Sequence, residues 1–392
     1  MYSRLLRMAS NQSQFLFGPR QVGKTTWLKQ LYGNDPSTFW PDLLDTPTYL
    51  RFSRAPETFY AEIKYQIDGA KKNRIIVDEI QRIPALLNEV HRLIEDKKAQ
   101  FILTGSSARK LKRGGANLLA GRAIQNYLFP LTFAELRNDF NLPEILQFGS
   151  LPALIELPTT EKKRLLQTYV ETYLREEIKA EALVRDLGPF SRFLDVAAAC
   201  NGEILNYSNV SNDCQTPYAD VKSYYEIIED TYLGFRLEAW RQSVRKRVAT
   251  TPKFYLFDTG VANAINRQLT DPPTPTQRGR LFEHLMIVEV YRQLHYQHSE
   301  DRLYFWRTSN HIEVDLLIER GGNILAAIEF KSAQAVSGRD CGGLRSFHAE
   351  YPAVPRYLVA DVPMPYEQDG ILVLPWRHFL EQIPGLLEKG IG

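Results

Sequence analysis

The residues best suited to chemistry near the start of the chain surround Lys24. Gly18, Gly23, Lys24 and Thr25 have the spacing G-x-x-x-x-G-K-T, preceded by an apolar strand pattern and followed by a helical one. Glycines let successive backbone N–H groups point at phosphate oxygens, and the start of a helix adds positive potential. Lys24 can then reach the β- and γ-phosphates, and the Thr25 hydroxyl suits Mg²⁺. The residues predicted to bind ATP are Gly18, Gln21, Val22, Gly23, Lys24, Thr25, Thr26 and Thr104.

Two acidic residues fit the same reaction. Asp78 and Glu79 follow the apolar residues 75–77, a run typical of a strand buried on both faces of a parallel sheet. Asp78 is predicted to join the Mg²⁺ shell, and Glu79 to act as the general base toward water. The next apolar run ends in hydroxyl residues, so Thr104 or Ser106 senses the γ-phosphate, or the segment is a strand followed by a simple Gly-Ser turn.

Carboxylates and a lysine recur in the last third of the chain. Asp315, Glu329 and Lys331 lie on two predicted strands joined by a Gly-Gly turn, and Glu283 lies on a predicted helix before them. A two-residue turn would pair Asp315 with Ile328, whereas a three-residue turn would pair it with Glu329. We expect the three-residue turn, with Asp315 and Glu329 as Mg²⁺ ligands and Lys331 orienting or activating water for attack on a phosphodiester. Such a site would cleave phosphodiester bonds. The alternative is that the domain has the fold of a nuclease but does not cleave DNA, since Glu-x-Lys is also frequent on exposed strand edges.

Basic residues cluster in the middle of the chain. Residues 236–247 hold five basic side chains against one acid, Glu238, between two predicted strands and after three helical patterns. This is the layout of a winged helix, with the basic residues on its hairpin. The predicted DNA contacts are Arg241, Arg245, Lys246 and Arg247. The third helix has few base-reading groups, which favours DNA structure over sequence; the alternative is a structural winged helix whose charges are solvated or contact another subunit.

Composition limits the class of protein. At roughly 100–200 residues per domain, 392 residues make up two to four domains. The 48 basic and 46 acidic residues leave a net charge of +2, so overall charge indicates no partner. Hydrophobic residues at 44% and charged residues at 24% exclude a disordered or fibrous chain. Three widely spaced cysteines argue against a disulfide framework. Without a signal-peptide pattern or a long apolar run, we expect a cytoplasmic protein with no membrane contact.

Several motifs follow one another in a family-specific order. GPRQVGKTT, IIVDEIQRIPALLNEV, FILTGSSARKL, LAGRA and LFPLTFAEL resemble the prokaryotic AAA+ ATPases of the AAA-14 type with a DUF4143 C-terminal region, and the similarity runs along essentially the whole chain. From the residues alone, Arg122 is most simply a surface arginine. The resemblance implies that Arg122 acts as a finger in a neighbouring subunit's site, within a homo-oligomeric ring. The order helix-Glu, Asp, Glu-x-Lys also resembles the PD-(D/E)XK nuclease core, with Val314 in place of its proline. This resemblance implies that Glu283 is a further Mg²⁺ ligand beside Asp315 and Glu329.

The predicted helices and strands divide the chain into several domains. The predicted fold class is multidomain α/β: a P-loop AAA+ parallel sheet with a helical lid, then a winged helix, then a mixed α/β nuclease-like domain. The predicted bounds are 1–148 for the ATPase core, 149–189 for the lid, 190–269 for the winged helix, 270–277 for a Pro-rich linker and 278–392 for the nuclease-like domain.

These predictions combine into one function and two alternatives. The catalytic residues would be Lys24, Glu79, Arg122 and Lys331, in a Mg²⁺-dependent ATPase that binds DNA and remodels it or translocates on it, with branched DNA among the candidates. The first alternative is a nucleotide-controlled switch that acts through a protein partner, with a degenerate terminal fold. The second is a DNA nuclease gated by ATP.

Overall fold

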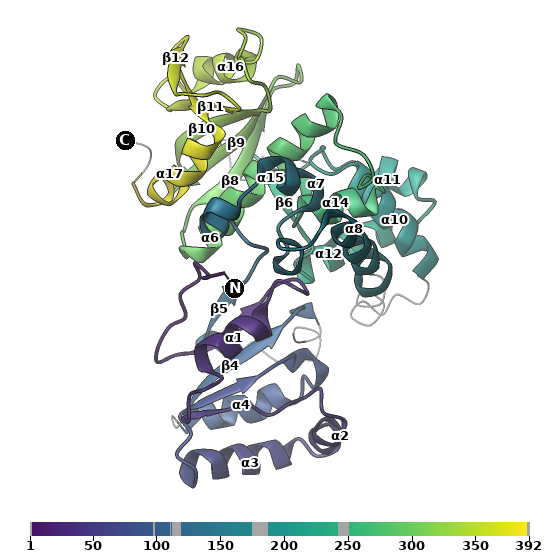
Figure 1. Cartoon of the computed structure of the whole chain (residues 1–392), viewed down its shortest axis with the longest axis vertical. Helices are drawn as coiled ribbons and strands as arrows, with labels where there is room; N and C mark the ends of the chain where they lie inside the picture. The colour runs from purple at the N-terminus through teal and green to yellow at the C-terminus, as the bar shows by residue number, and fades with distance from the viewer. Residues whose placement is uncertain are drawn as a thin grey trace.

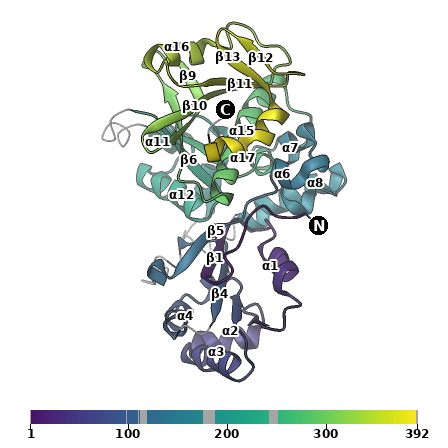
Figure 2. The ribbon, with the colours of Figure 1, turned by 90° about the vertical axis from the view of Figure 1, so that its left-hand side faces the viewer.

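The computed structural model describes residues 2–96, 99–109, 111, 119–174, 187–241 and 251–389. Two β-sheets lie toward opposite ends of the longest axis of the molecule (Figure 1). In the perpendicular view, the helices from the middle of the chain lie between these ends, next to the sheet of the C-terminal part (Figure 2). Within the described ranges, no helix is both long and apolar enough to cross a membrane.

The first sheet is the parallel sheet predicted for the N-terminal part. Its strands are β1 (Ser13–Phe17), β2 (Thr38–Phe39), β3 (Arg74–Val77), β4 (Gln100–Gly105) and β5 (Ala123–Tyr127). Their order is β2-β3-β4-β1-β5, and every neighbouring pair is parallel. Helix α1 (Lys24–Tyr32) packs on one face, and the other face is covered by α2 (Thr46–Arg54), α3 (Glu57–Asp68) and α4 (Leu86–Glu95). Both faces are buried, which explains the unbroken apolar runs in the strands.

The middle of the chain is mostly helical. Its helices are α6 (Phe133–Leu136), α7 (Leu142–Phe148), α8 (Thr159–Thr168), a π-helix (Tyr169–Leu174), α10 (Leu187–Ala199), α11 (Tyr207–Asp213), α12 (Tyr218–Asp230) and α14 (Thr259–Ile265). Short 3₁₀ helices lie at Ile80–Arg82, Leu119–Gly121, Arg137–Asp139 and Pro152–Leu154. The apolar face of α10, α11 and α12 shares one hydrophobic cluster with α1 and with the face of the first sheet that α1 covers. The helical region is therefore packed directly against the nucleotide-binding part and does not form an independently packed domain.

The second sheet has eight strands and is mixed. The strands are β6 (Gly234–Ala239), β7 (Lys253–Leu256), β8 (Arg302–Arg307), β9 (Glu313–Arg320), β10 (Asn323–Lys331), β11 (Arg356–Ala360), β12 (Tyr366–Gln368) and β13 (Ile371–Pro375), in the order β12-β13-β11-β10-β9-β8-β6-β7. Helices α15 (Pro275–Tyr296) and α17 (Trp376–Lys389) pack on one face, and α16 (Gly342–Glu350) packs on the other. The chain is thus a multidomain α/β protein with a parallel sheet followed by a mixed one, as predicted.

Contacts cross three of the predicted domain boundaries. Helices α6 and α7 lie in the predicted ATPase core, yet their apolar side chains pack in the same cluster as α15 and α17. The hairpin of β6 and β7, predicted to be the wing of a separate domain, extends the second sheet, because β6 pairs in parallel with β8. Helix α15 begins at Pro275, inside the predicted linker, since Thr274 and Gln277 form a capping box there. The first two boundaries are crossed by long-range contacts, which local composition does not reveal. The third was misplaced because the prolines of the predicted linker include the first residue of α15.

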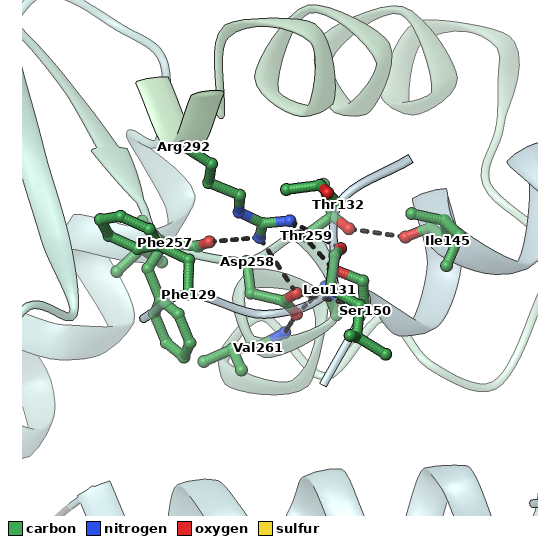
Figure 3. A network of polar contacts seen from close by, with 12 residues as sticks. Phe129, Leu131, Thr132, Ile145, Ser150, Phe257, Asp258, Thr259, Val261 and Arg292 are labelled. Carbon is green, nitrogen blue, oxygen red and sulfur yellow. Dashed lines mark hydrogen bonds and ion pairs between the residues drawn. The ribbon is translucent and has the colours of Figure 1, made fainter. Parts of the chain in front are cut away.

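Arg292 of α15 lies where these parts meet (Figure 3). It is 1% exposed. Its Nη1 donates to the carbonyl oxygen of Leu131 at 3.2 Å and to Ser150 Oγ at 3.0 Å, and its Nη2 donates to the carbonyl oxygen of Phe257 at 2.9 Å. Asp258 Oδ2 lies 3.7 Å from Nη2 and accepts a hydrogen bond from the backbone of Ser150. One guanidinium therefore joins three segments that are far apart in the sequence.

The turn between β9 and β10 differs from the predicted one. Arg320 pairs with Asn323, so the turn has two residues, Gly321 and Gly322, both with positive φ. The prediction of a three-residue turn was wrong. A β-bulge between Ile324 and Ala326 then shifts the register by one residue, so that Ile328 pairs with Leu316. Continued by one residue, this register places Glu329 opposite Asp315, which is the pairing that the three-residue turn was expected to produce.

Candidate functional site

The loop between β1 and α1 has the backbone conformation that a phosphate-binding loop needs. Gly18 has φ of 147°, and a Cβ built there would lie 2.0 Å from the carbonyl oxygen of Leu128, so only glycine fits. Gly23 has φ of 91°, and Gln21, which is not a glycine, also has positive φ, 62°. Lys24 is 6% exposed, and its Nζ donates to the carbonyl oxygens of Gly18 and Pro19 at 2.7 and 2.9 Å. The Lys24 side chain thus lies along the loop that is predicted to bind phosphate.

Hydroxyl and acidic residues meet at the carboxyl ends of the neighbouring strands. Thr25 Oγ1 donates to Asp78 Oδ2 at 2.6 Å, and Thr104 Oγ1 donates to Asp78 Oδ1. Thr104 Oγ1 also accepts the backbone N–H of Glu79 at 3.0 Å. Parallel strands bring their carboxyl ends to the same edge of a sheet, and this explains why β3, β4 and α1 deliver these side chains to one place. The structure therefore brings together Thr25, Asp78, Glu79 and Thr104 as predicted neighbours.

A residue that sequence reasoning missed holds the predicted base. Glu79 has a left-handed backbone, with φ of 55°, and its Oε2 accepts a hydrogen bond from Gln81 Nε2 at 2.5 Å. Gln81 is 3% exposed, and Nε2 also donates to Ser106 Oγ at 3.1 Å. Ser106 thus contacts Glu79 through Gln81, whereas Thr104 contacts Asp78 directly. The only sequence signal for Gln81 was a polar residue shortly after the acidic pair.

The remaining predicted ATP contacts follow from their places on the loop and the helix. Val22 is buried, Gln21 is half-buried, and Thr26 is exposed on the first turn of α1. The predicted lid approaches the same loop, because Tyr169 Oη donates to the carbonyl oxygen of Arg20 at 3.4 Å. The loop is therefore contacted from the predicted lid side as well as from the first sheet.

Arg4, which sequence analysis did not identify, donates a hydrogen bond to the backbone of the same loop. Its Nη1 donates to the carbonyl oxygen of Val22 at 2.9 Å, and its Nε lies 3.0 Å from Glu135 Oε1. Its Nη2 donates to Tyr296 Oη on α15 at 2.9 Å. The side chain of Arg4 is 4% exposed. The phosphate-binding loop is thereby tied to the long helix of the C-terminal part.

Arg122 lies away from this chain's own phosphate-binding loop. It directly precedes β5, whose first residue pairs with Ser13 at the start of β1, whereas the loop follows the other end of β1. Its Nε lies 2.5 Å from Glu95 Oε1, and its side chain is 39% exposed. Any action of Arg122 on a nucleotide would therefore be on that of another subunit.

A contact joins the nucleotide-binding part to α12. Arg109 Nη1 lies 2.8 Å from Asp230 Oδ2, and the backbone N–H of Ala108 donates to the carbonyl oxygen of Asp230 at 3.2 Å. Two residues beyond Asp230, the ring of Tyr232 stacks on Phe17, with ring centroids 5.7 Å apart. The side chain of Arg109 is 9% exposed and that of Asp230 is 25% exposed, so the ion pair is partly shielded from water. The partner of Arg109 comes from a distant part of the chain.

The basic cluster predicted to bind DNA is described only in part. Arg245, Lys246 and Arg247 lie outside the described residues. Arg241 is half-buried, and its Nη1 donates to the carbonyl oxygen of Arg307 at 2.9 Å. Trp240 is 3% exposed and packs on Tyr304.

The C-terminal carboxylates form a second polar cluster. Lys331 Nζ lies 2.5 Å from Glu329 Oε1, and Asp315 Oδ2 accepts the backbone N–H of Phe330 at 2.8 Å. Burial raises the pKa of Asp315, and Glu329 raises it further. Burial also raises the pKa of Glu329, although Lys331 opposes this effect.

Glu283 does not complete the predicted metal site. Its Oε1 lies 3.1 Å from Lys253 Nζ and accepts a hydrogen bond from Tyr255 Oη at 2.7 Å. In the part of the chain that the structure describes, no three His, Cys, Asp or Glu side chains are grouped so that they could hold a metal ion. The described residues therefore do not present the predicted set of three carboxylate ligands, and Glu283 pairs with Lys253 and Tyr255 of β7.

A glycine-rich loop between a strand and a helix, with an acidic pair at the end of another parallel strand of the same sheet, defines a P-loop nucleotide-binding domain. Comparison with family models agrees: residues 10–137 match the AAA domain family AAA_14, and residues 278–379 match a domain of unknown function, DUF4143. The chain thus has one segment that matches an AAA domain and another that matches DUF4143, as predicted. Residues 139–271 match another domain of unknown function, DUF8612, which spans both the predicted lid and the predicted winged helix.

Relatives come from bacteria and archaea. An uncharacterized protein of Mycobacterium tuberculosis is 25% identical over 313 residues, which cover 78% of this chain and 67% of that protein. One of Methanocaldococcus jannaschii is 23% identical over 343 residues, covering 80% of this chain and 73% of that protein. A solved structure of the Aeropyrum pernix ORC1 protein in complex with DNA is 12% identical and covers 67% of this chain and 88% of that chain, with a TM-score of 0.24. A TM-score this low adds nothing to the description of the fold.

Proposed function

We propose that this protein is a Mg²⁺-dependent ATPase that binds DNA, recognises its structure rather than its sequence, and remodels it or translocates on it. The observation that carries the ATPase part is the hydrogen-bonded group of Thr25, Asp78 and Thr104 beside Lys24. These are the residue types that hold Mg²⁺ and phosphate in P-loop enzymes, at the edge of the sheet where nucleotides bind.

The proposed roles follow from these positions. Lys24 would bind the β- and γ-phosphates, while Thr25 and Asp78 would hold Mg²⁺, whose charge offsets that of the phosphates. Glu79, kept in place by Gln81, would accept the proton of the attacking water. Arg122 would act on the nucleotide of a neighbouring subunit in a homo-oligomeric ring, since it lies at the opposite edge of its own sheet.

DNA is the proposed partner because the basic residues 241–247 lie in the sequence between β6 and β7 and because α12 is joined to the ATPase part. The contacts of Ala108 and Arg109 with Asp230 link the segment after β4 to the end of α12. A change at Thr104 on nucleotide binding or hydrolysis would reach α12 along this short path.

The same link favours a second candidate function, a nucleotide-controlled switch. Trp240 is buried and Arg241 is bonded to the backbone of Arg307, so fewer groups of the hairpin are left to contact DNA than the sequence indicated. In this case the nucleotide state would set the position of α12 for a protein partner.

The rate of ATP hydrolysis separates the two candidates. We expect several-fold stimulation by one form of DNA when the purified chain is assayed without DNA and then with duplex, single-stranded and four-way-junction DNA. The Glu79→Gln protein is the blank. A rate that no DNA form changes would contradict the DNA-dependent ATPase and favour the switch.

The salt dependence of DNA binding tests the basic cluster independently. Each phosphate contact contributes about 0.9 to the slope of log affinity against log salt, so replacing Arg245, Lys246 and Arg247 by alanine should reduce the slope by up to about 3. A matched control replaces three exposed basic residues elsewhere, Arg54, Lys71 and Arg164. An equal loss of slope in both proteins would show that the cluster has no special role.

A further inference from the structure

Lys253 reaches the C-terminal carboxylates from another part of the chain. It lies on β7 and is 4% exposed. Its Nζ lies 3.1 Å from Glu283 Oε1 and also contacts Glu313 Oε1. Tyr255, on the same face of β7, donates to the same oxygen of Glu283. Two donors of β7 therefore share Oε1, one of the two carboxylate oxygens of Glu283.

The neighbouring carboxylates are partnered unequally. Glu329 Oε1 is paired with Lys331, and Asp315 Oδ2 accepts a backbone N–H. The other oxygen, Glu329 Oε2, is buried, and no donor of the described residues lies within hydrogen-bonding distance of it. The side chain of Glu329 is only 9% exposed. A buried carboxylate oxygen without a donor is costly, and it marks the place where a cation would be bound most favourably.

The positive charges near Glu329 Oε2 explain why a divalent ion would bind there only weakly. Four carboxylates, those of Glu283, Glu313, Asp315 and Glu329, share the ammonium groups of Lys253 and Lys331. Glu313 Oε2 also lies 3.8 Å from Arg307 Nη1, at the outer side of the cluster. A divalent cation needs several oxygen ligands at once, and here it would compete with Lys253 for them. The two cations would also repel each other strongly, because charges interact more strongly at a buried site than in water.

We propose that Lys253 excludes divalent cations from the cluster of Glu283, Glu313, Asp315 and Glu329 for as long as β7 keeps its place in the second sheet. The ability of the C-terminal domain to bind a metal is then set by β7, a strand that lies outside that domain's family match. An open cleft of about 620 Å³ is lined by Glu283 and Lys331, so a cation would reach the cluster from solvent once Lys253 is removed.

Mn²⁺ binding to the full chain tests this proposal. The free-ion signal of Mn²⁺ in electron paramagnetic resonance gives its affinity without any assay of activity. All proteins carry Asp78→Asn and are free of nucleotide, so that the ATPase site does not contribute. We expect Lys253→Met and Lys253→Gln to bind one Mn²⁺ at least about tenfold more tightly than the parent, since each removes one neighbouring positive charge.

Three further variants make the result specific. Lys253→Arg keeps the charge and should bind Mn²⁺ as weakly as the parent. Glu329→Gln added to Lys253→Met should remove the gain. Mn²⁺ should also raise the melting temperature of Lys253→Met but not that of the parent, because a ligand that binds only the folded state stabilises it.

Two outcomes would overturn the proposal. One is equal Mn²⁺ affinity in the parent and in the folded Lys253→Gln protein, whose amide still supplies a donor for Glu283. The other requires no change at Lys253: tight Mn²⁺ binding by the parent that Glu329→Gln abolishes would show that the cluster accepts a divalent ion with Lys253 in place.

Discussion

Replacing Arg292 by methionine is expected to lower the free energy of unfolding by about 3–5 kcal/mol, the usual effect of removing one partner of a buried ion pair. The substitution would leave the carboxylates of Asp258 and Glu289 buried, each 1% exposed, without their nearest cation. It would also remove the donor for the carbonyl oxygens of Leu131 and Phe257 (Figure 3). Urea denaturation followed by far-UV circular dichroism measures the change.

The defect should depend on pH in a defined direction. Burial raises the pKa of Glu289 to about 7, even though Arg292 lowers it, whereas an unfolded glutamate titrates near about 4.3. The folded state therefore binds a proton more tightly than the unfolded state, so this group favours folding at low pH and opposes it as the pH rises through 7. Without Arg292 the pKa of Glu289 rises further, and the Arg292→Met protein should lose more stability at pH 8 than at pH 5.5.

The matched control lies on the same helix. Arg280 is exposed and pairs with Glu203 at the surface, so Arg280→Met should change the stability by less than about 1 kcal/mol. Equal effects of the two substitutions, or a defect of Arg292→Met that does not vary with pH, would contradict the central role assigned to the Arg292 network.

Replacing Glu79 by glutamine is expected to slow ATP hydrolysis by roughly 100- to 10,000-fold, the range for loss of a general base. ATP affinity should change little, because the groups proposed to hold ATP, Lys24 and Thr25, remain. Single-turnover hydrolysis and equilibrium binding of a fluorescent ATP analogue measure the two effects separately.

Two other variants serve as controls for the Glu79→Gln result. Lys24→Ala should weaken nucleotide binding itself, because it removes the side chain proposed to contact the phosphates. Glu57→Gln removes an exposed acid from the start of α3 and should leave both quantities unchanged. A Glu79→Gln protein that hydrolyses ATP at the normal rate would exclude Glu79 as the base and require another residue for that role.

The nucleotide site was predictable because its parts are local. Gly18, Gly23, Lys24 and Thr25 lie within eight consecutive residues, and the short loop leaves them little freedom in relative position. Asp78 and Thr104 lie far along the chain, but Asp78 directly follows β3 and Thr104 is the last residue but one of β4. The rule that the carboxyl ends of parallel strands lie at the same edge of a sheet therefore predicts that the two residues are close together. Gln81 was missed because its role depends on the left-handed backbone at Glu79, which no spacing rule predicts.

The C-terminal pair was predicted for the wrong reason. The expected three-residue turn is absent, and the bulge near Leu325 restores the register that brings Glu329 opposite Asp315. A turn and a bulge each change the register by one residue, so the same pairing arises in two ways, and sequence alone does not distinguish them.

The parallel sheet, the phosphate-binding loop and the acidic pair could be predicted from the sequence, since all three depend on periodicity and short-range spacing. The partners of Arg109, Lys253 and Arg292 could be identified only in the packed fold. Each of these side chains is long and charged, and such a residue looks like an exposed one until the element that covers it is known. The covering groups come from distant segments, so burial and pairing arise only when the whole chain is packed.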